Sequence, residues 1–244
     1  MNNNISGSPA IFELNPYVQH KYQMHQLGAK GECPNGDIYR YAHLGADVAT
    51  GLLLTGVLGD DNHHNVTLSA IAAVGAVEVK PTVGATAVTA GMFNEGTLVF
   101  NDVAPEGHTY EIIGHTVSAA GSEVITVKIA PELKVAATAA SQVSLHRNAF
   151  QYPIIQSVTT VTPCGVAIMA WDVSEASYGW VKSKGIVSVL ADATGTTKGY
   201  LGCISDQTAG AIGVKSDMDI ERAICQYLET GTAGEYNAVY MFID

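Results

Sequence analysis

The chain has 244 residues, of which 47% are hydrophobic and 14% are charged, and its formal net charge is −11. This apolar content excludes intrinsic disorder of the whole chain, and the length is enough for one large domain or two small ones. The 12 lysines and arginines form no cluster, and an acidic chain repels phosphates, which argues against a nucleic-acid-binding protein.

The chain opens with a polar segment that is not typical of a core. Met1–Pro16 lacks the basic start and the apolar run of a signal peptide. The longest apolar tract, Val66–Val79, is interrupted by polar residues and is too short to span a bilayer. We therefore expect a protein made in the cytoplasm, with no membrane partner. Residues 1–30 carry only scattered large side chains and predict an extended arm, which either reaches a neighbouring subunit or lies on its own domain.

Short strands follow this arm. Pro34–Asp37 predicts a tight turn, because Asn-Gly supplies the positive φ that such turns need, and Ile38–Ala42 is β-prone. From Glu78 onward, β-branched and aromatic runs alternate with turn clusters, a pattern typical of a sandwich or a barrel. Ser122–Ile129 alternates polar and apolar residues, as one buried face requires.

A second β-rich stretch begins after residue 146. Near the end of the sequence, Arg222–Leu228 and Ala238–Phe242 predict a hairpin, with a short helix over Asp217–Leu228 as the alternative. We expect a mainly β fold with two small antiparallel β-sandwich or barrel domains and an extended N-terminal arm. The expected segments are 1–60 (arm and first strands), 61–146 (central β domain) and 147–244 (C-terminal β domain). No clean internal repeat is evident.

Motifs that carry chemistry are missing from the sequence. It contains no phosphate-binding loop, no nucleophile elbow and no HExxH motif. His63 and His64 lie beside two aspartates, but adjacent side chains on an extended chain point apart, which favours a polar loop over a metal site. We expect no catalytic residues, no cofactor and no metal, and hence no enzyme. The scattered cysteines predict buried thiols: Cys33, Cys164, Cys203 and Cys225.

Aromatic residues and the scarcity of charge point toward partners. Average soluble proteins have roughly 25% charged residues, so we expect part of this weakly charged surface to be buried in an assembly. The aromatic residues of the second half either form core, contribute to an interface or make a stacking platform for sugars. The interface candidates are Phe12, Tyr17, Tyr39, Trp171, Tyr178 and Trp180.

Five short motifs resemble structural proteins of tailed phages. Glu13–His20 and Asn35–Ala46 are similar to the opening of these proteins, and Asn94–Asp102 with Pro105–Ile112 is similar to their central domain. Ser177–Gly185, with the sequence SYGWVKSKG, is similar to a signature near their C-terminal domain. The motifs consist of turn and strand residues and touch the beginning, middle and end of the chain.

The resemblance implies a capsid decoration (cement) protein. Such a protein is a β-rich oligomer on the outer surface of the virion, and it stabilises the capsid by straddling joints between capsid subunits. The implied partners are the major capsid protein and further copies of the chain, with a homotrimer favoured over a dimer. The acidic charge fits the outside of a DNA-filled shell better than its lining. A receptor- or glycan-binding tail or fibre component is the alternative.

Overall fold

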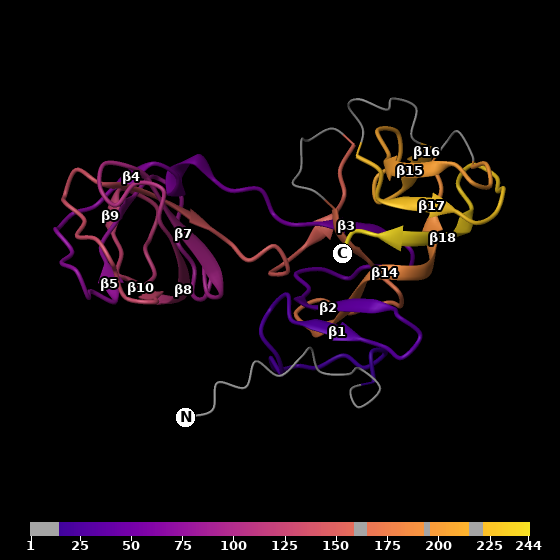
Figure 1. The fold of residues 1–244 in the computed structure, drawn as a ribbon, viewed down its shortest axis with the longest axis horizontal. Coiled ribbons are helices and arrows are strands. Elements are labelled where there is room, and N and C mark those ends of the chain that lie inside the picture. Colours follow the sequence, from indigo (N-terminus) through magenta and orange to yellow (C-terminus); the bar gives the residue numbers. More distant parts are fainter. Residues whose placement is uncertain (1–14, 159–164, 193–195, 215–221) are drawn as a thin grey trace. The chain divides into compact units, whose positions relative to one another are not determined.

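The computed structural model describes residues 15–158, 165–192, 196–214 and 222–244 (Figure 1). Apart from a single 3-10 turn at Asp61–His63, these residues form strands, turns and loops, with no α-helix among them. Two curled antiparallel sheets form half-barrels. The predicted mainly β fold class is therefore confirmed.

The chain divides into two compact units. The central unit comprises Leu58–Asn148, and the flanking unit combines Met1–Val57 with Ala149–Asp244. The sequence predicted three consecutive segments, whereas the first and the last belong together here. The reason is a direct ladder between β2 (Ile38–His43) and β14 (Tyr178–Leu190). In this ladder Ile38 lies opposite Lys184 at one end and His43 lies opposite Tyr178 at the other.

The central unit is a six-stranded antiparallel sheet with a separate two-stranded ladder. The sheet runs in the order β4 (Val66–Thr67), β11 (Gln142–His146), β7 (Gly96–Asp102), β8 (Thr109–His115), β10 (Val127–Ala130) and β5 (Glu78–Val79), and the ladder pairs β6 (Thr82–Val83) with β9 (Glu123–Val124). Ile125, Val127 and Ile129 are buried while Lys128 is exposed, so the alternation predicted there is confirmed. The core is mostly aliphatic, with Phe93 and Phe100 as its largest fully buried side chains.

The flanking unit is a ten-stranded sheet built around the 13-residue strand β14. Its main path runs β12 (Ile154–Ile155), β3 (Leu53–Thr55), β13 (Gly165–Ile168), β14, β18 (Tyr236–Phe242), β17 (Cys225–Tyr227), β15 (Leu201–Ile204) and β16 (Ile212–Val214), with β1 (Lys30–Glu32) paired to β2. β14 pairs with β2 up to Lys184 and with β18 from Lys184 on, so it joins two parts of the sheet.

Two local predictions are confirmed in the flanking unit. The turn at Pro34–Asp37 connects the hairpin of β1 and β2, and Gly36 adopts a φ of 85°. The C-terminal hairpin pairs β17 with β18, with Cys225 opposite Met241 and Tyr227 opposite Val239. The alternative helix over Asp217–Leu228 falls partly outside the described residues, but Cys225–Tyr227 is a strand.

One turn recurs in both units. Four isolated β-bridges join loop residues in pairs: Val48 with Val173, Ala72 with Ala137, Val88 with Ser118, and Thr196 with Gly231. In seven of these eight loops the third residue after the bridge has a positive φ, and six of those seven residues are glycines. Glycine populates this conformation at little cost. The repetition is structural and was not evident in the sequence, because the turn fixes only one glycine position.

Candidate interaction site

The flanking unit carries an open, weakly charged sheet face, which we call the outer face. It consists of outward side chains of β14, β18 and β17 and of Leu228, which follows β17: Ile186, Ser188, Gln226, Leu228, Tyr236, Ala238, Tyr240 and Phe242. The exposed fractions of Ile186, Tyr236 and Tyr240 are 60%, 52% and 40%. No residue of this set is charged, and Lys184 lies at its margin, opposite Phe242 in the ladder.

The pleat of the strands explains this face. Successive side chains of a strand point to opposite sides, and the inward set of β14 and β18 includes Val187, Val189 and Val239, which are core. The outward set is aligned across the strands, because Ile186 lies opposite Tyr240 and Tyr240 lies opposite Gln226. Cross-strand neighbours on one face are close enough for their side chains to touch, so the outward residues form one continuous surface.

A polar cavity adjoins the outer face. Its volume is about 690 Å³, and its walls come from β1, the turn before β2, β14 and β18. Three tyrosines and five polar residues line it: Tyr17, Tyr39 and Tyr240, with Glu32, Asn35, Asp37, Lys182 and Lys184. This volume lies within the range of about 300–1,000 Å³ that is usual for small-molecule sites.

A buried ion pair fixes one wall of this cavity. Lys182 Nζ lies 2.6 Å from Asp37 Oδ2 and also donates to the carbonyl oxygen of Ile186 at 2.7 Å. Asn35 Nδ2 donates to the same aspartate oxygen at 3.0 Å. A Cβ atom at position 185 would overlap Asp37 Oδ1, so Gly185 is what lets the carboxylate approach the backbone of β14. Paired and hydrogen-bonded in this way, both charges are compatible with burial.

Tyr39 and Lys184 provide contrasting polar groups in the same cavity. Burial raises the pKa of the Tyr39 hydroxyl, and the neighbouring Tyr17 and Asp37 raise this pKa further, so it is neutral at physiological pH. Lys184 is half-buried, and its ammonium forms no ion pair with any residue that the structure describes. The cavity therefore combines a neutral hydroxyl with an available cation.

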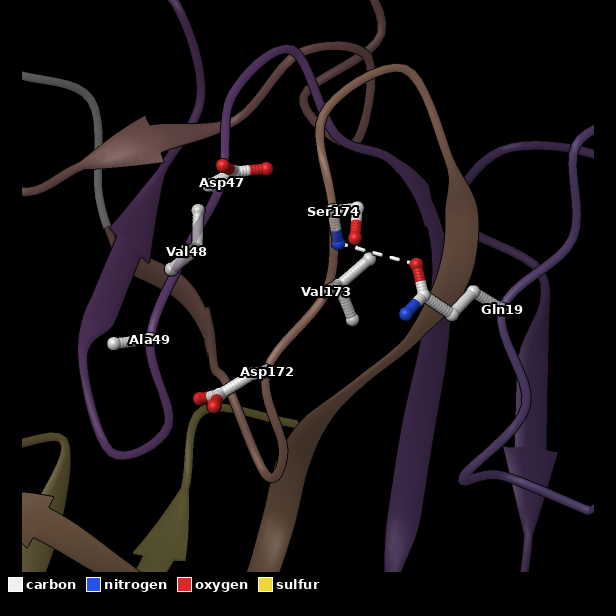
Figure 2. Close-up of a pocket in the computed structure, with 7 residues that line it drawn as sticks. All are labelled: Gln19, Asp47, Val48, Ala49, Asp172, Val173 and Ser174. Carbon is white, nitrogen blue, oxygen red and sulfur yellow. Dashed lines mark hydrogen bonds between the residues drawn. The ribbon is translucent and has the colours of Figure 1, made fainter.

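A second cavity of about 460 Å³ lies between two bridged turns of the flanking unit (Figure 2). Asp172 Oδ1 accepts hydrogen bonds from the backbone N–H and the hydroxyl of Thr50, at 2.7 and 2.8 Å. Asp47 Oδ1 accepts in return from the N–H of Glu175 at 2.7 Å. The hydrogen bonds from the side chain and the backbone of Thr50 lower the pKa of Asp172. This reciprocal arrangement holds the two turns together, and we interpret it as structural.

The structure separates the aromatic residues predicted as interface candidates. Tyr39 and Trp180 are buried in the flanking unit, which removes their side chains from contact with a partner. Trp171 is half-buried beneath Tyr17, with ring centroids 4.9 Å apart, and Tyr17 itself is exposed. The ring of Tyr178 stacks on the ring of His43, with 3.9 Å between the ring centroids. Phe12 lies outside the described residues.

The list of interface candidates left out the aromatic residues of the outer face, although Tyr236 and Tyr240 belong to the second-half aromatic residues for which an interface was one open interpretation. Tyr236, Tyr240 and Phe242 alternate along β18 with Val239 and Met241, so both faces of this strand are apolar. A strand with one solvated face normally alternates apolar with polar residues. This departure from the usual alternation leaves one face of the strand apolar and exposed.

The histidine and cysteine residues singled out in the sequence lie apart. His63 is buried against Phe93, with Nε2 3.2 Å from the carbonyl oxygen of Thr86, whereas the ring of His64 lies 4.9 Å from that of His146. The described residues contain no group of three or more metal-ligating side chains. Of the cysteines in the described ranges, Cys203 and Cys225 are buried and Cys33 is half-buried; Cys164 lies outside. Burial raises the pKa of Cys225 to about 12, which makes this thiol a poor nucleophile.

Comparisons with known proteins add no relative. No family model matches the chain, and no curated protein or solved structure is significantly similar to it. Within the part of the chain that the structure describes, no helix is long and apolar enough to cross a membrane.

Proposed function

We propose that the chain is a structural virion protein of the capsid decoration type. It binds the outer face of the major capsid shell and stabilises the shell through self-association and contacts between capsomers. The observation that carries this proposal is the outer face, a largely aromatic and aliphatic sheet surface whose charged residue in the ladder, Lys184, lies at its margin. The resemblance of five motifs to tailed-phage structural proteins supports the choice of a virion.

Charge explains why association would use this surface. Each copy has a formal net charge of −11, so two copies repel one another at long range. A contact between uncharged surfaces avoids bringing carboxylates together and requires little desolvation of charge. Burial of apolar area contributes roughly 25 cal/mol per Å² before the entropy of association is subtracted. We therefore propose a second copy of the chain as the occupant of the outer face, and capsid attachment through the remaining surface.

Repetition makes a modest contact sufficient for this function. A decoration protein occurs in many copies, and each copy that is linked to its neighbours binds with an increased effective concentration. The shell then resists internal pressure through many weak contacts. No catalytic group is required for this mechanism.

Sedimentation of the purified protein tests the association step. We expect a homotrimer, with a dimer as the alternative, and we expect Tyr240→Ser combined with Phe242→Ser to shift the protein toward monomer. Ile113→Ser is the matched control, because Ile113 is also an exposed strand residue, with an exposed fraction of 55%, but lies in the central unit. A wild-type protein that stays monomeric at micromolar concentrations would contradict the proposal.

Copy number and heat resistance test the location in the virion. Quantitative mass spectrometry of purified particles is expected to find hundreds of copies for a decoration protein. A tail or fibre component, the alternative function, predicts a few tens or fewer. Particles that lack the protein should release DNA at a lower temperature than complete particles, and equal heat resistance would count against the decoration role.

A further inference from the structure

We propose that the polar cavity of the flanking unit binds carbohydrate, namely a neutral pyranose sugar held through its hydroxyl groups. This inference goes beyond the proposed function and does not depend on it. The cavity is concave, within the usual size range of ligand sites, and built from strands that are distant in the sequence.

The balance of charge in the cavity selects the class of ligand. The carboxylates of Glu32 and Asp37 and the ammonium groups of Lys182 and Lys184 line the same space, so the formal charges cancel. Asp37 and Lys182 form an ion pair with one another, and Glu32 lies 3.5 Å from Lys30, so most of these charges are already compensated and a charged ligand gains little from them. A hydroxyl group both donates and accepts a hydrogen bond, so a ligand rich in hydroxyls suits this mixture of donors and acceptors.

The walls of the cavity are fixed before a ligand arrives. Lys182 has an exposed fraction of 5%, and its ammonium is held by Asp37 and by a backbone carbonyl oxygen. Gly185 has no Cβ atom, and a Cβ at this position would overlap Asp37 Oδ1 and displace the carboxylate. A site whose polar groups are already positioned loses less entropy when it binds.

Two tyrosines supply flat apolar surfaces beside these polar groups. Tyr17 and Tyr240 have exposed fractions of 65% and 40%, and both line the cavity. The Tyr17 ring packs on Trp171, which limits the orientations that it adopts. A pyranose ring has an apolar face of C–H groups as well as a hydroxyl rim, and exposed tyrosine rings bind such faces while their hydroxyls remain available for hydrogen bonds.

A ligand screen with the full chain tests the assignment. Saturation-transfer NMR with a panel of neutral monosaccharides, together with an array of bacterial and animal glycans, should identify a bound sugar, and calorimetry then measures its affinity. We expect Tyr17→Ala to weaken binding about three- to tenfold and Lys184→Met to weaken it about tenfold or more. Both side chains are at least partly exposed, so both variants are expected to fold.

Matched variants elsewhere in the flanking unit are the controls. Tyr200→Ala removes a tyrosine with an exposed fraction of 56% that does not line the cavity, and Lys198→Met removes an exposed lysine. Both should bind the sugar like the wild type. The assignment is overturned if no neutral sugar binds, if only acidic sugars or sulfate bind, or if the control variants lose as much affinity as the cavity variants.

The same variants separate this proposal from the proposed function. Tyr240 and Ile186 belong to both the cavity and the outer face, so the single substitutions are made at Tyr17 and Lys184 instead. Tyr17→Ala should lose sugar affinity while its oligomeric state is unchanged. Phe242→Ser should weaken self-association without lowering sugar affinity. Sugar binding by a protein that proves to be monomeric would support the sugar site and would contradict the proposed self-association.

Discussion

The outer sheet faces of the two units differ in charge, although both sheets are antiparallel. In the central unit, Thr97 lies opposite Glu111, and Lys128 lies opposite Glu78 with 4.0 Å between nitrogen and oxygen. In the flanking unit, Ile186 lies opposite Tyr240, and the charged residue nearest to this pair in the ladder is Lys184 at the margin. The first face mixes charged and polar residues with the exposed Ile113, whereas the second leaves mainly aromatic and aliphatic groups in water.

The inner faces of the two units do not explain this difference. Both units bury regular sets of apolar side chains, so both are folded by the same physical effect. What varies is the set of residues that folding leaves outside. The outer face leaves apolar area that its own unit does not bury, which supports the proposal that the flanking unit carries the association surface.

The first prediction separates the two cores. Phe100→Ala in the central unit and Trp180→Ala in the flanking unit each remove a fully buried ring, at a cost of about 3–5 kcal/mol. Both tryptophans of the chain, Trp171 and Trp180, belong to the flanking unit. Phe100→Ala should therefore lower the midpoint of a calorimetric transition without moving the midpoint of tryptophan fluorescence. A common shift of both midpoints would show that the two cores unfold as one.

The second prediction compares two ion pairs. Asp37→Leu leaves the buried ammonium of Lys182 without its partner and should destabilise the flanking unit by about 3–5 kcal/mol. Adding Lys182→Met should recover much of this loss, because no isolated charge then remains buried. Glu78→Gln breaks the Lys128–Glu78 pair, whose side chains are half-exposed, and should cost at most about 1 kcal/mol. Denaturant unfolding measures the free energy of unfolding of the three variants. Equal losses of stability for Asp37→Leu and Glu78→Gln would contradict the predicted difference between a buried and an exposed ion pair.

Much of the fold was predictable because local signals agreed with it. The turn at Pro34–Asp37, the alternation around Val127 and the C-terminal hairpin each depend on residues close together in the sequence. The pairing of β2 with β14 was not predictable, because it joins residues more than 130 positions apart and no local pattern specifies that register. The three-segment division of the chain differed from the two units for this reason.

The candidate site was predicted less well than the fold. Aromatic type alone does not separate core from surface, and Trp180 and Tyr39 proved to be core residues. The outer face was detectable only as a strand with two apolar faces, at Tyr236–Phe242. The polar cavity had no signal in the sequence, since Asp37, Lys182 and Tyr240 meet only through the sheet.

The third prediction concerns pH and the central unit. Burial lowers the pKa of His63 from its ordinary value of 6.5, so the folded state binds a proton there less readily than the unfolded state does. The contribution of His63 to stability is therefore complete above pH 6.5 and is lost as the pH falls below this value, with a slope of at most about 1.4 kcal/mol per pH unit. His63→Gln keeps a donor toward Thr86 and cannot titrate. This variant should show a shallower loss of stability between pH 7 and 5, although His146, whose pKa is also lowered, retains part of the slope.

The smallest predicted effect tests whether the recurring turn is the same in both units. Gly75 in the central unit and Gly199 in the flanking unit have φ values of +85° and +87°, and at both positions an added Cβ has no heavy atom within 4 Å. Alanine at either position then costs only the backbone strain of a left-handed residue, about 1 kcal/mol. Gly51 occupies the equivalent place after Val48, but an added Cβ there would overlap the Tyr236 ring at the edge of the outer face, so Gly51→Ala should cost more. Denaturant unfolding of the three variants measures their losses of stability. If Gly51→Ala loses no more stability than the other two, then Tyr236 moves aside freely, and the turn at Gly51 does not fix this end of the outer face.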